Sequence, residues 1–422
     1  MRTRFLGAGI CVLMLLPKKP AAQQRGAMSR QTHPWGLPPW RVDFRPASAP
    51  LPDRVDFAIV GGGFTGLSAA AWLGRLAPGK SVLVVEASAL GEGASGRTGG
   101  LALGETAAGP LPGLGDVLAG YQEILRTLGI DAGLELPGVY ELGRAHATRD
   151  SPICWSDSGD LQAVGTVPGG AVDPGKVVAG LARAAEKAGV HIVEHSEVQD
   201  IECFHPPCLR VRRNVRGRVQ QKKIRASEIL LAMNAFSLEL SGLRGSTQPK
   251  LTLAVATAPL SRAQLQAIGL SSRRPFYTVD LPYLWGRLLD SNGIVFGAGL
   301  VPSPATIASL FAKPTRTRSP GYAAPDLYRF DVRQGEAAES FRWLEDRVHH
   351  LHPVLESVRI TTRWAGPILF TEEMRPVFRR HPRSKNLMVL AGYNGHGVAL
   401  AVYLGRWAAE VLLDRRSLPI WG

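Results

Sequence analysis

The chain has 422 residues, of which 45% are hydrophobic and 20% are charged, and it carries a formal net charge of +14. This length predicts about two domains, and the composition is that of a globular chain with a large core rather than a repetitive or low-complexity one. The cysteines are too few and too scattered for a disulfide framework, and their spacing predicts no metal site; they are Cys11, Cys154, Cys203 and Cys208.

The first segment of the chain, residues 1–22, is similar to a secretory signal. Arg2 and Arg4 precede a 12-residue apolar run, and small residues follow it. The run is too short to span a bilayer, so we do not expect association with a membrane. In a second interpretation the true start is Met28 and the upstream residues are a mis-called extension. We expect a cytoplasmic protein in which residues 1–52 are an extended arm or a targeting extension.

The next segment has the layout of a dinucleotide-binding βαβ unit. A short apolar strand, residues 55–60, runs into Gly61-x-Gly63-x-x-Gly66, a helix-compatible stretch follows, and Glu86 closes a second apolar strand. Gly61 permits the tight turn, Gly63 lets the backbone approach a pyrophosphate, and Gly66 lets the helix pack on the strand. Glu86 can accept hydrogen bonds from ribose hydroxyls. The pyrophosphate is expected at the helix N-terminus, where unpaired N–H groups favour negative charge.

Residues 91–100 are mostly small, which allows backbone to lie against an extended ligand. A flavin site needs such a segment, because the cofactor continues past the ribose, whereas a nicotinamide site does not. Further along, we predict helices over residues 114–128 and 175–187, the second capped by Asp173 and Pro174, and strands over 190–194, 196–201 and 228–232.

Eight basic residues and no acid lie between Arg210 and Arg225. Such a run is compatible with nucleic-acid binding. However, valines alternate with the basic residues around a central Arg-Gly-Arg turn, and no aromatic side chains are interleaved for base stacking. We therefore predict a solvated β-hairpin and no nucleic-acid partner.

The second half of the chain predicts an antiparallel sheet and then a return to the first domain. Residues 251–260 and 276–300 are strand-like, with a hairpin turn at 290–293, and a surface helix is expected over 336–350. A buried strand over 387–391 runs into a glycine loop and a final helix. The predicted fold is α/β, with a Rossmann-like domain and a second, mainly antiparallel-sheet domain. The first takes residues 53–107, 168–243 and 361–416, and the second takes 108–167 and 244–360.

Five segments together resemble the FAD-dependent oxidoreductases of the D-amino-acid-oxidase type, a group with glycine oxidase, sarcosine oxidase and γ-glutamylputrescine oxidase. They are the turn at 61–66, Ala94-Ser-Gly-Arg-Thr-Gly-Gly100, the helix and strands over 173–198, Trp364-Ala-Gly366 with its trailing Thr371 and Pro376, and Ala391-Gly-Tyr-Asn-Gly-His-Gly-Val398. The resemblance spans residues 55–413. The Ser-Gly-Arg segment is most similar to the γ-glutamylputrescine oxidase branch, where Asn usually stands in place of Thr98.

The resemblance implies an extended FAD, held non-covalently because no cysteine lies near the C-terminal glycine loop. It implies Arg97 and His396 as catalytic groups that add charge beside the flavin. The implied cofactor-binding residues are Gly61, Gly63, Phe64, Thr65, Gly66, Glu86, Ala94, Ser95, Arg97, Thr98, Gly99, Gly100, Leu101, Val198, Gly366, Gly392, Gly395, His396, Gly397 and Val398.

The implied reaction is oxidation of a C–N bond in a small amine or amino acid. Hydride passes to flavin N5, the imine product hydrolyses, and O₂ or another acceptor takes the electrons. Tyr283, Trp285 and Arg287 share one strand face by their spacing and are the predicted substrate residues, although an ordinary sheet face would give the same pattern. Sarcosine-oxidase-like members carry a lysine on this sheet, and none occurs here between Lys250 and Lys313. A dehydrogenase therefore stays open beside an oxidase.

Two alternatives share the fold or the cofactor. One is a flavin reductase or hydroxylase that depends on NAD(P)H. The other is a flavin-binding subunit without turnover.

Overall fold

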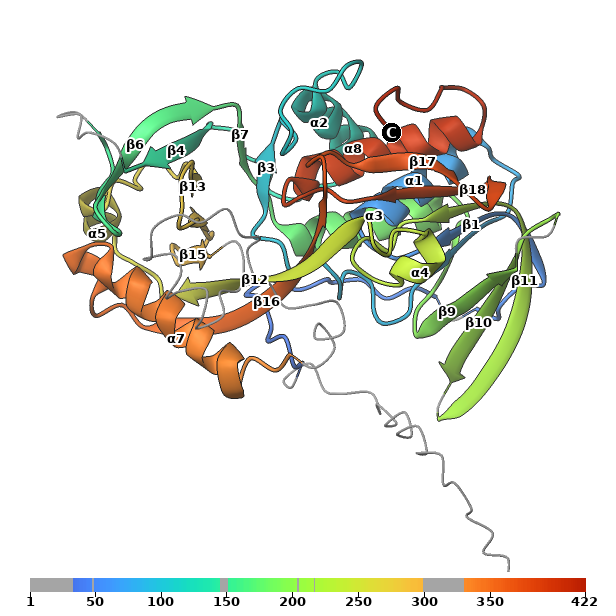
Figure 1. Cartoon of the computed structure of the whole chain (residues 1–422), viewed down its shortest axis with the longest axis horizontal. Helices are drawn as coiled ribbons and strands as arrows, with labels where there is room; N and C mark the ends of the chain where they lie inside the picture. Colours follow the sequence, from blue (N-terminus) through green and yellow to red (C-terminus); the bar gives the residue numbers. More distant parts are fainter. Residues whose placement is uncertain (1–32, 48, 145–150, 203–204, 216, 299–329) are drawn as a thin grey trace, which may run out of the picture.

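The computed structural model describes residues 33–47, 49–144, 151–202, 205–215, 217–298 and 330–422. They form two lobes, each built on a large β-sheet (Figure 1). The signal-like segment 1–22 and Met28 lie outside the described residues. Within the described residues, no helix combines the length and the apolar character that crossing a membrane requires.

The first lobe contains a mostly parallel sheet with the strand order β17-β18-β11-β1-β2-β8. Its strands are β1 (Arg54–Val60), β2 (Val82–Val85), β8 (His191–Val193), β11 (Arg218–Leu231), β17 (Val377–His381) and β18 (Ser384–Ala391). Both faces of β1 are buried, with Phe57 and Ile59 in one core cluster and Ala58 and Val60 in another. This is why the end of the strand, residues 57–60, is an unbroken apolar run in the sequence.

Helices cover one face of this sheet: α1 (Phe64–Leu76), α2 (Val117–Leu128), α3 (Pro174–Lys187) and α8 (Gly397–Leu412). The predicted start of α3 is confirmed, because the Asp173 side chain accepts a hydrogen bond from the Lys176 amide. α2 begins three residues later than predicted, because Asp116 caps it through the Ala119 amide. The short elements β3 (Leu101–Leu103), β7 (Gly169–Ala171) and α4 (Leu238–Ser241) complete the lobe.

The basic run forms the predicted hairpin, in which β10 (Cys208–Val215) pairs with β11 and with β9 (Ser196–Glu202). Three of its cations have acidic partners on β9: Arg210 pairs with Asp200, Arg212 with Glu197, and Lys223 with Glu202. The strand predicted separately over 228–232 is the continuation of the hairpin strand. β11 is therefore one long strand whose first half is solvated and whose second half is buried beside β1.

The second lobe contains a mostly antiparallel sheet with the order β16-β12-β15-β14-β13-β4-β6-β5. Its strands are β4 (Val139–Gly143), β5 (Cys154–Ser156), β6 (Asp160–Val167), β12 (Thr247–Thr257), β13 (Phe276–Thr278), β14 (Trp285–Leu288), β15 (Ile294–Gly297) and β16 (Ile360–Thr371). The hairpin predicted at 290–293 joins β14 to β15, with Asn292 at φ 65°. α5 (Arg262–Ala267), α7 (Gly335–His350) and the 3₁₀ turn η3 (Pro353–Leu355) pack on this lobe, and α7 buries Phe341, Leu344 and Val348 in its core.

The long pair β12 and β16 passes from one lobe to the other (Figure 1). Ala365 lies in the core of the second lobe, whereas Leu369, four residues later, lies in the core of the first. The domain boundary at residue 361 stays a prediction; β16 begins beside it, at Ile360, and is hydrogen-bonded to β12 along its whole length. The two lobes are thus joined by continuous strands rather than by a flexible linker.

Candidate active site

A cavity of about 820 Å³ lies where the two lobes meet. Its walls come from the carboxyl ends of β1, β2 and β11, from residues 91–103, from β12 and β16, and from the loop before α8. Open parallel sheets bind ligands at this edge, and the volume is at the upper end for small-molecule and cofactor pockets. Most of the residues that were predicted to hold a cofactor therefore lie around one space.

The first glycine turn has the geometry that the sequence pattern requires. Gly61 has a φ of +111°, in the region that side chains disfavour, and a Cβ on Gly66 would lie 2.0 Å from the Gly61 carbonyl oxygen. A Cβ on Gly63 would lie 2.7 Å from Ser95 Oγ, which accepts the Phe64 amide at 2.9 Å. The N-terminus of α1, including Thr65, lines the cavity, so its amides can face an anionic ligand.

Glu86 stands directly after β2 and lines the same cavity. Its carboxylate accepts the Gly62 amide at 2.7 Å and the Ser88 amide at 2.9 Å. Burial raises the pKa of the Glu86 carboxyl, and these two amides oppose that rise. Val198 on β9 lies along the same stretch. This end of the cavity has the acid and the backbone that an adenosine ribose needs.

The segment of residues 91–101 lies along the middle of the cavity, and Ala94, Ser95, Thr98, Gly99 and Leu101 line it. Gly100 does not line it. Its φ is +81°, and a Cβ there would lie 2.3 Å from the Val172 carbonyl oxygen, so this glycine serves the path of the chain rather than a ligand contact.

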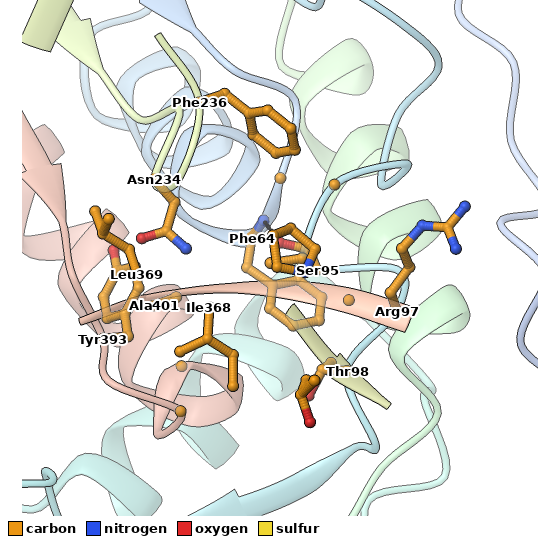
Figure 2. A pocket seen from close by; sticks show the side chains of 18 of the residues that line it. Phe64, Ser95, Arg97, Thr98, Asn234, Phe236, Ile368, Leu369, Tyr393 and Ala401 are labelled. Carbon is orange, nitrogen blue, oxygen red and sulfur yellow. Dashed lines mark hydrogen bonds between the residues drawn. The ribbon is translucent and has the colours of Figure 1, made fainter. Parts of the chain in front are cut away.

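Arg97 lines the cavity with part of its side chain, but its guanidinium extends away from the neighbouring side chains (Figure 2). The guanidinium donates to the carbonyl oxygens of Glu92, Trp35, Gly36 and Ala365. Burial lowers the pKa of Arg97 to about 10, so it stays charged at neutral pH. The guanidinium of Arg97, which was predicted to add charge beside the flavin, is thus hydrogen-bonded to main-chain oxygens in this structure.

The second glycine turn also forms part of the cavity wall. Gly395, His396 and Gly397 line it, and α8 begins there. Burial lowers the pKa of His396, against a smaller raising effect of the Asn394 carbonyl and of Glu105, so the neutral imidazole is favoured at pH 7.

Two of the predicted residues near this turn lie behind the cavity wall. Gly392 donates its amide to Asn234 Oδ1 at 3.0 Å, and its φ is +76°. Val398 is buried in the helical core of the first lobe. Gly366, on β16, does line the cavity, and a Cβ there would lie 3.3 Å from the Arg97 Cβ.

On the second lobe, Tyr283 and Trp285 line the cavity but Arg287 does not. Arg287 is 6% exposed, donates its Nε to the Gly99 carbonyl oxygen at 2.5 Å, and lies 5.2 Å from the centre of the Trp40 ring. The structure therefore places this guanidinium in the seam between the lobes. It is not in a position to clamp a substrate carboxylate within the cavity.

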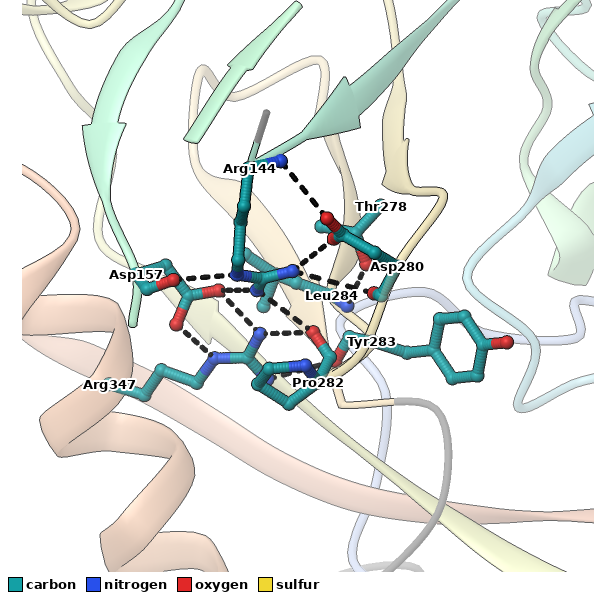
Figure 3. A network of polar contacts seen from close by, with 8 residues as sticks. All are labelled: Arg144, Asp157, Thr278, Asp280, Pro282, Tyr283, Leu284 and Arg347. Carbon is teal, nitrogen blue, oxygen red and sulfur yellow. Dashed lines mark hydrogen bonds and ion pairs between the residues drawn. The ribbon is translucent and has the colours of Figure 1, made fainter. Parts of the chain in front are cut away.

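The loop that carries Tyr283 is fixed from behind by a buried ionic network (Figure 3). Asp157 pairs with both Arg144 and Arg347, and Arg144 also pairs with Asp280. The Arg347 guanidinium donates to the carbonyl oxygens of Pro282 and Tyr283 at 2.7 and 2.8 Å. The phenol of Tyr283 points away from this network, which leaves it free to face a ligand.

Several cavity-lining residues were not predicted. Asn234 and Phe236 follow the end of β11, and Ile368 and Leu369 lie on β16 (Figure 2). The position of Asn234 directly after a buried parallel strand is a signal that could have identified it. His33 and Trp35 come from the N-terminal arm, where no motif or spacing indicates a site.

The cavity fits an extended dinucleotide such as FAD. The first glycine turn leaves room for a pyrophosphate beside a helix N-terminus, and the half-buried Glu86 suits a ribose. A second helix N-terminus, at Gly397, opens on the same cavity. Gly61, Gly63, Glu86 and the backbone of residues 94–99 and 395–397 are the groups that would hold it.

Comparison with known proteins also indicates an FAD-binding protein. Residues 56–411 match the family model described as FAD dependent oxidoreductase. The chain is 26% identical to the probable oxidoreductase OrdL of Haemophilus influenzae, over 87% of this chain and 85% of that protein. It is 25% identical to gamma-glutamylputrescine oxidoreductase of Escherichia coli, over 85% and 83% of the two chains. The structure of glycine oxidase from Geobacillus kaustophilus shares the fold, with a TM-score of 0.64 and 21% identity over 87% of this chain and 96% of that one.

Proposed function

This chain belongs to the family of FAD-dependent oxidoreductases, and we propose that it oxidises a C–N bond of a small amine or amino acid to an imine that hydrolyses. Its relatives include a gamma-glutamylputrescine oxidoreductase and a glycine oxidase, which supports an amine as the substrate. The single observation that carries the proposal is that both glycine turns and the Tyr283 loop line one cavity. A cofactor held by the turns and a substrate held by the loop would therefore meet within it.

FAD, when bound, accepts the hydride of the substrate carbon at its N5 atom. The protein's part is to position the two reactants and to stabilise the charge that develops. The N-terminus of α8 is directed at the cavity, and a helix N-terminus stabilises a nearby negative charge by roughly 0.3–1 kcal/mol, or up to about 2 kcal/mol when partly buried. His396, which is neutral because burial lowers its pKa, can donate a hydrogen bond there without adding a full charge.

The side chains of the cavity favour a substrate that is recognised through its amine rather than through a carboxylate. Among the described lining residues, the only arginine is Arg97, whose guanidinium is occupied by four carbonyl oxygens. Tyr283 and Trp285 provide aromatic faces, which attract ammonium groups by cation–π contact. We therefore rank primary and N-substituted amines above simple α-amino acids as candidate substrates.

The test is an anaerobic titration of the FAD-loaded protein with a panel of primary amines, N-alkylated amines, polyamines and amino acids, followed by absorbance of the flavin. The expected result is bleaching by at least one amine in the absence of nicotinamide, with the corresponding aldehyde or keto product. Bleaching by NADPH alone would show a reductase or hydroxylase instead. Bound flavin that no amine reduces would show a non-catalytic subunit. Admission of O₂ after bleaching separates an oxidase from a dehydrogenase.

A further inference from the structure

The N-terminal strap, which we define as residues 33–47, precedes the part of the chain that the family model matches, residues 56–411. Apart from an isolated bridge between Gly36 and Trp364, it contains no strand or helix. It nevertheless contacts both lobes and the cavity, and in Figure 1 it is the dark blue segment beside β16.

The first part of the strap is docked on the second lobe. The Pro34 carbonyl oxygen accepts the Val332 amide at 2.7 Å, and the Trp35 carbonyl oxygen accepts the Ala365 amide at 2.8 Å. Trp35 is 6% exposed, belongs to the core of that lobe, and stacks on Phe236 with the ring centres 6.0 Å apart. His33, Pro34 and Trp35 all line the cavity, so the strap forms part of its wall.

The middle of the strap holds the cofactor loop, which we define as residues 92–100. Trp40 donates its indole N–H to the Gly96 carbonyl oxygen at 2.8 Å and packs edge-on against Trp364, 5.4 Å away. From the other side, Arg97 in this loop donates to the carbonyl oxygens of Trp35 and Gly36. The strap and the cofactor loop are therefore hydrogen-bonded to each other in both directions.

The last part of the strap is docked on the first lobe. Val42 and Phe44 pack against the helical core, and the Ala47 amide donates to Glu186 on α3 at 2.9 Å. A Cβ on Gly175 would lie 2.2 Å from the Arg41 carbonyl oxygen, so the strap passes closely over the start of α3. The strap thus crosses the seam between the lobes with an anchor on each side.

The cofactor loop itself has turns but no strand or helix, so its shape depends on what surrounds it. Ser95 and Gly99 in the loop line the cavity, and Gly96 is the residue between them that the strap holds. We propose that Trp40 is a positioning residue for FAD: through Gly96, it keeps the cofactor loop in the shape that receives the cofactor. This inference rests on the FAD site described above.

The experiment compares two buried tryptophans. Trp40→Phe keeps an aromatic ring but removes the N–H that Gly96 accepts. Trp421→Phe is the matched control, since Trp421 is also buried (6% exposed, against 8% for Trp40) and its indole N–H has no hydrogen-bond partner among the described residues. The apoproteins are titrated with FAD, and their thermal unfolding is followed without FAD.

We expect Trp40→Phe to raise the Kd for FAD by about tenfold, because the ligand must then order a loop that the strap had ordered beforehand. Trp421→Phe should leave the Kd within about twofold of the unaltered protein. A Kd for Trp40→Phe that matches this control, in a folded protein, would overturn the inference. Failure of the unaltered protein to bind FAD would instead refute the FAD site itself.

A second measurement on the unaltered chain covers the case in which Trp40→Phe does not fold. Trypsin can cut after Arg41, an exposed residue of the strap, and after Arg244, an exposed residue that does not line the cavity. Saturating FAD should slow cleavage at Arg41 relative to Arg244, because a bound cofactor and a docked strap stabilise each other through the cofactor loop. An unchanged ratio of the two cleavage rates with and without FAD would contradict the inference.

Discussion

The Glu86 carboxylate accepts a hydrogen bond from the Gly62 amide at 2.7 Å, so the acid after β2 and the glycine turn after β1 are directly joined. The parallel pairing of β1 and β2 brings them together, with Val60 beside Val85. Gly62 and Glu86, which are 24 residues apart in the sequence, therefore belong to the same part of the site. Because the pKa of this half-buried acid is raised, we expect cofactor binding to depend on pH.

The affinity for FAD is expected to fall as the pH is lowered. Burial raises the pKa of Glu86, so lowering the pH protonates it at a value above its ordinary 4.5. The ionised carboxylate accepts hydrogen bonds from ribose hydroxyls, whereas the protonated form accepts fewer, so FAD binding favours ionisation. The Kd for FAD, measured from about pH 5 to pH 8, should rise toward the acidic end. In Glu86→Gln the Kd should be higher and nearly independent of pH; an identical pH profile in this variant would contradict the role of Glu86.

The raised pKa of Glu86 also makes the stability of the protein without FAD depend on pH, but in the opposite direction from the affinity for FAD. Because the folded-state pKa lies above the unfolded value, the contribution of this group to stability is present below pH 4.5 and is lost as the pH rises through the raised pKa. Between about pH 4 and pH 7 the unaltered apoprotein should therefore lose thermal stability relative to Glu86→Gln, whose side chain does not titrate. Thermal unfolding of the two apoproteins across this range provides the measurement, and a difference between their midpoints that does not change with pH would contradict it.

Gly63→Val should give a folded but colourless protein. A Cβ at this position already lies 2.7 Å from Ser95 Oγ, and the two methyl groups of valine would occupy the space where a pyrophosphate approaches. Absorbance at flavin wavelengths after purification with excess FAD measures retention, and circular dichroism checks the fold. Ser95→Ala is the companion variant, since it removes only the acceptor of the Phe64 amide and should keep most of the flavin. Normal flavin content in Gly63→Val would refute the assigned turn.

Tyr283 and Arg287 should respond differently to mutation. Tyr283→Ala is expected to raise KM for the amine by about fivefold with little change in FAD content, because it removes an aromatic face from the cavity. Arg287→Met should instead lower the thermal midpoint and the FAD affinity, because Arg287 holds the Gly99 carbonyl oxygen and packs on Trp40. Steady-state kinetics and FAD titration of both variants separate the two roles. If Arg287→Met raises KM and leaves the stability unchanged, the hypothesis that Arg287 binds a substrate carboxylate would be supported instead.

The ionic network behind the Tyr283 loop should be costly to break. Asp157 has a side chain that is 3% exposed and pairs with two arginines. Asp157→Asn leaves the buried Arg347 without a counter-ion and leaves Arg144 with Asp280 alone, whose side chain is 40% exposed. We expect a loss of about 3 kcal/mol in the free energy of unfolding. Arg212→Gln breaks an exposed pair with Glu197 and serves as the control, with an expected loss below about 1 kcal/mol. Equal losses in the two variants would show that the network does not fix the loop.

The local patterns predicted the first lobe well, because its signals are contained in short stretches of sequence. The glycine turn after β1, the capped start of α3 and the strand before α8 each depend on neighbouring residues, and all three are present. β11 was divided into two predicted strands because its exposed half and its buried half have different residue patterns, although the backbone is continuous.

The parts that the sequence did not predict depend on contacts between distant segments. Period-2 spacing placed Arg287 on the same face as Tyr283 and Trp285, but spacing alone does not show how far along the strand the cavity extends. The carbonyl oxygen of Gly99, 188 residues earlier, determines where its guanidinium lies. Trp35 of the strap reaches the cavity because Arg97 and Ala365 donate to its carbonyl oxygen, and no local pattern encodes such contacts.

The stoichiometry of flavin release tests whether two glycine turns, more than 300 residues apart, hold one non-covalent FAD. The purified chain is saturated with FAD, freed of excess ligand and precipitated with acid, and the flavin in the supernatant and the pellet is measured. We expect one FAD per chain, all of it in the supernatant. A chain that retains no flavin, or flavin that remains attached to the precipitated polypeptide, would contradict it.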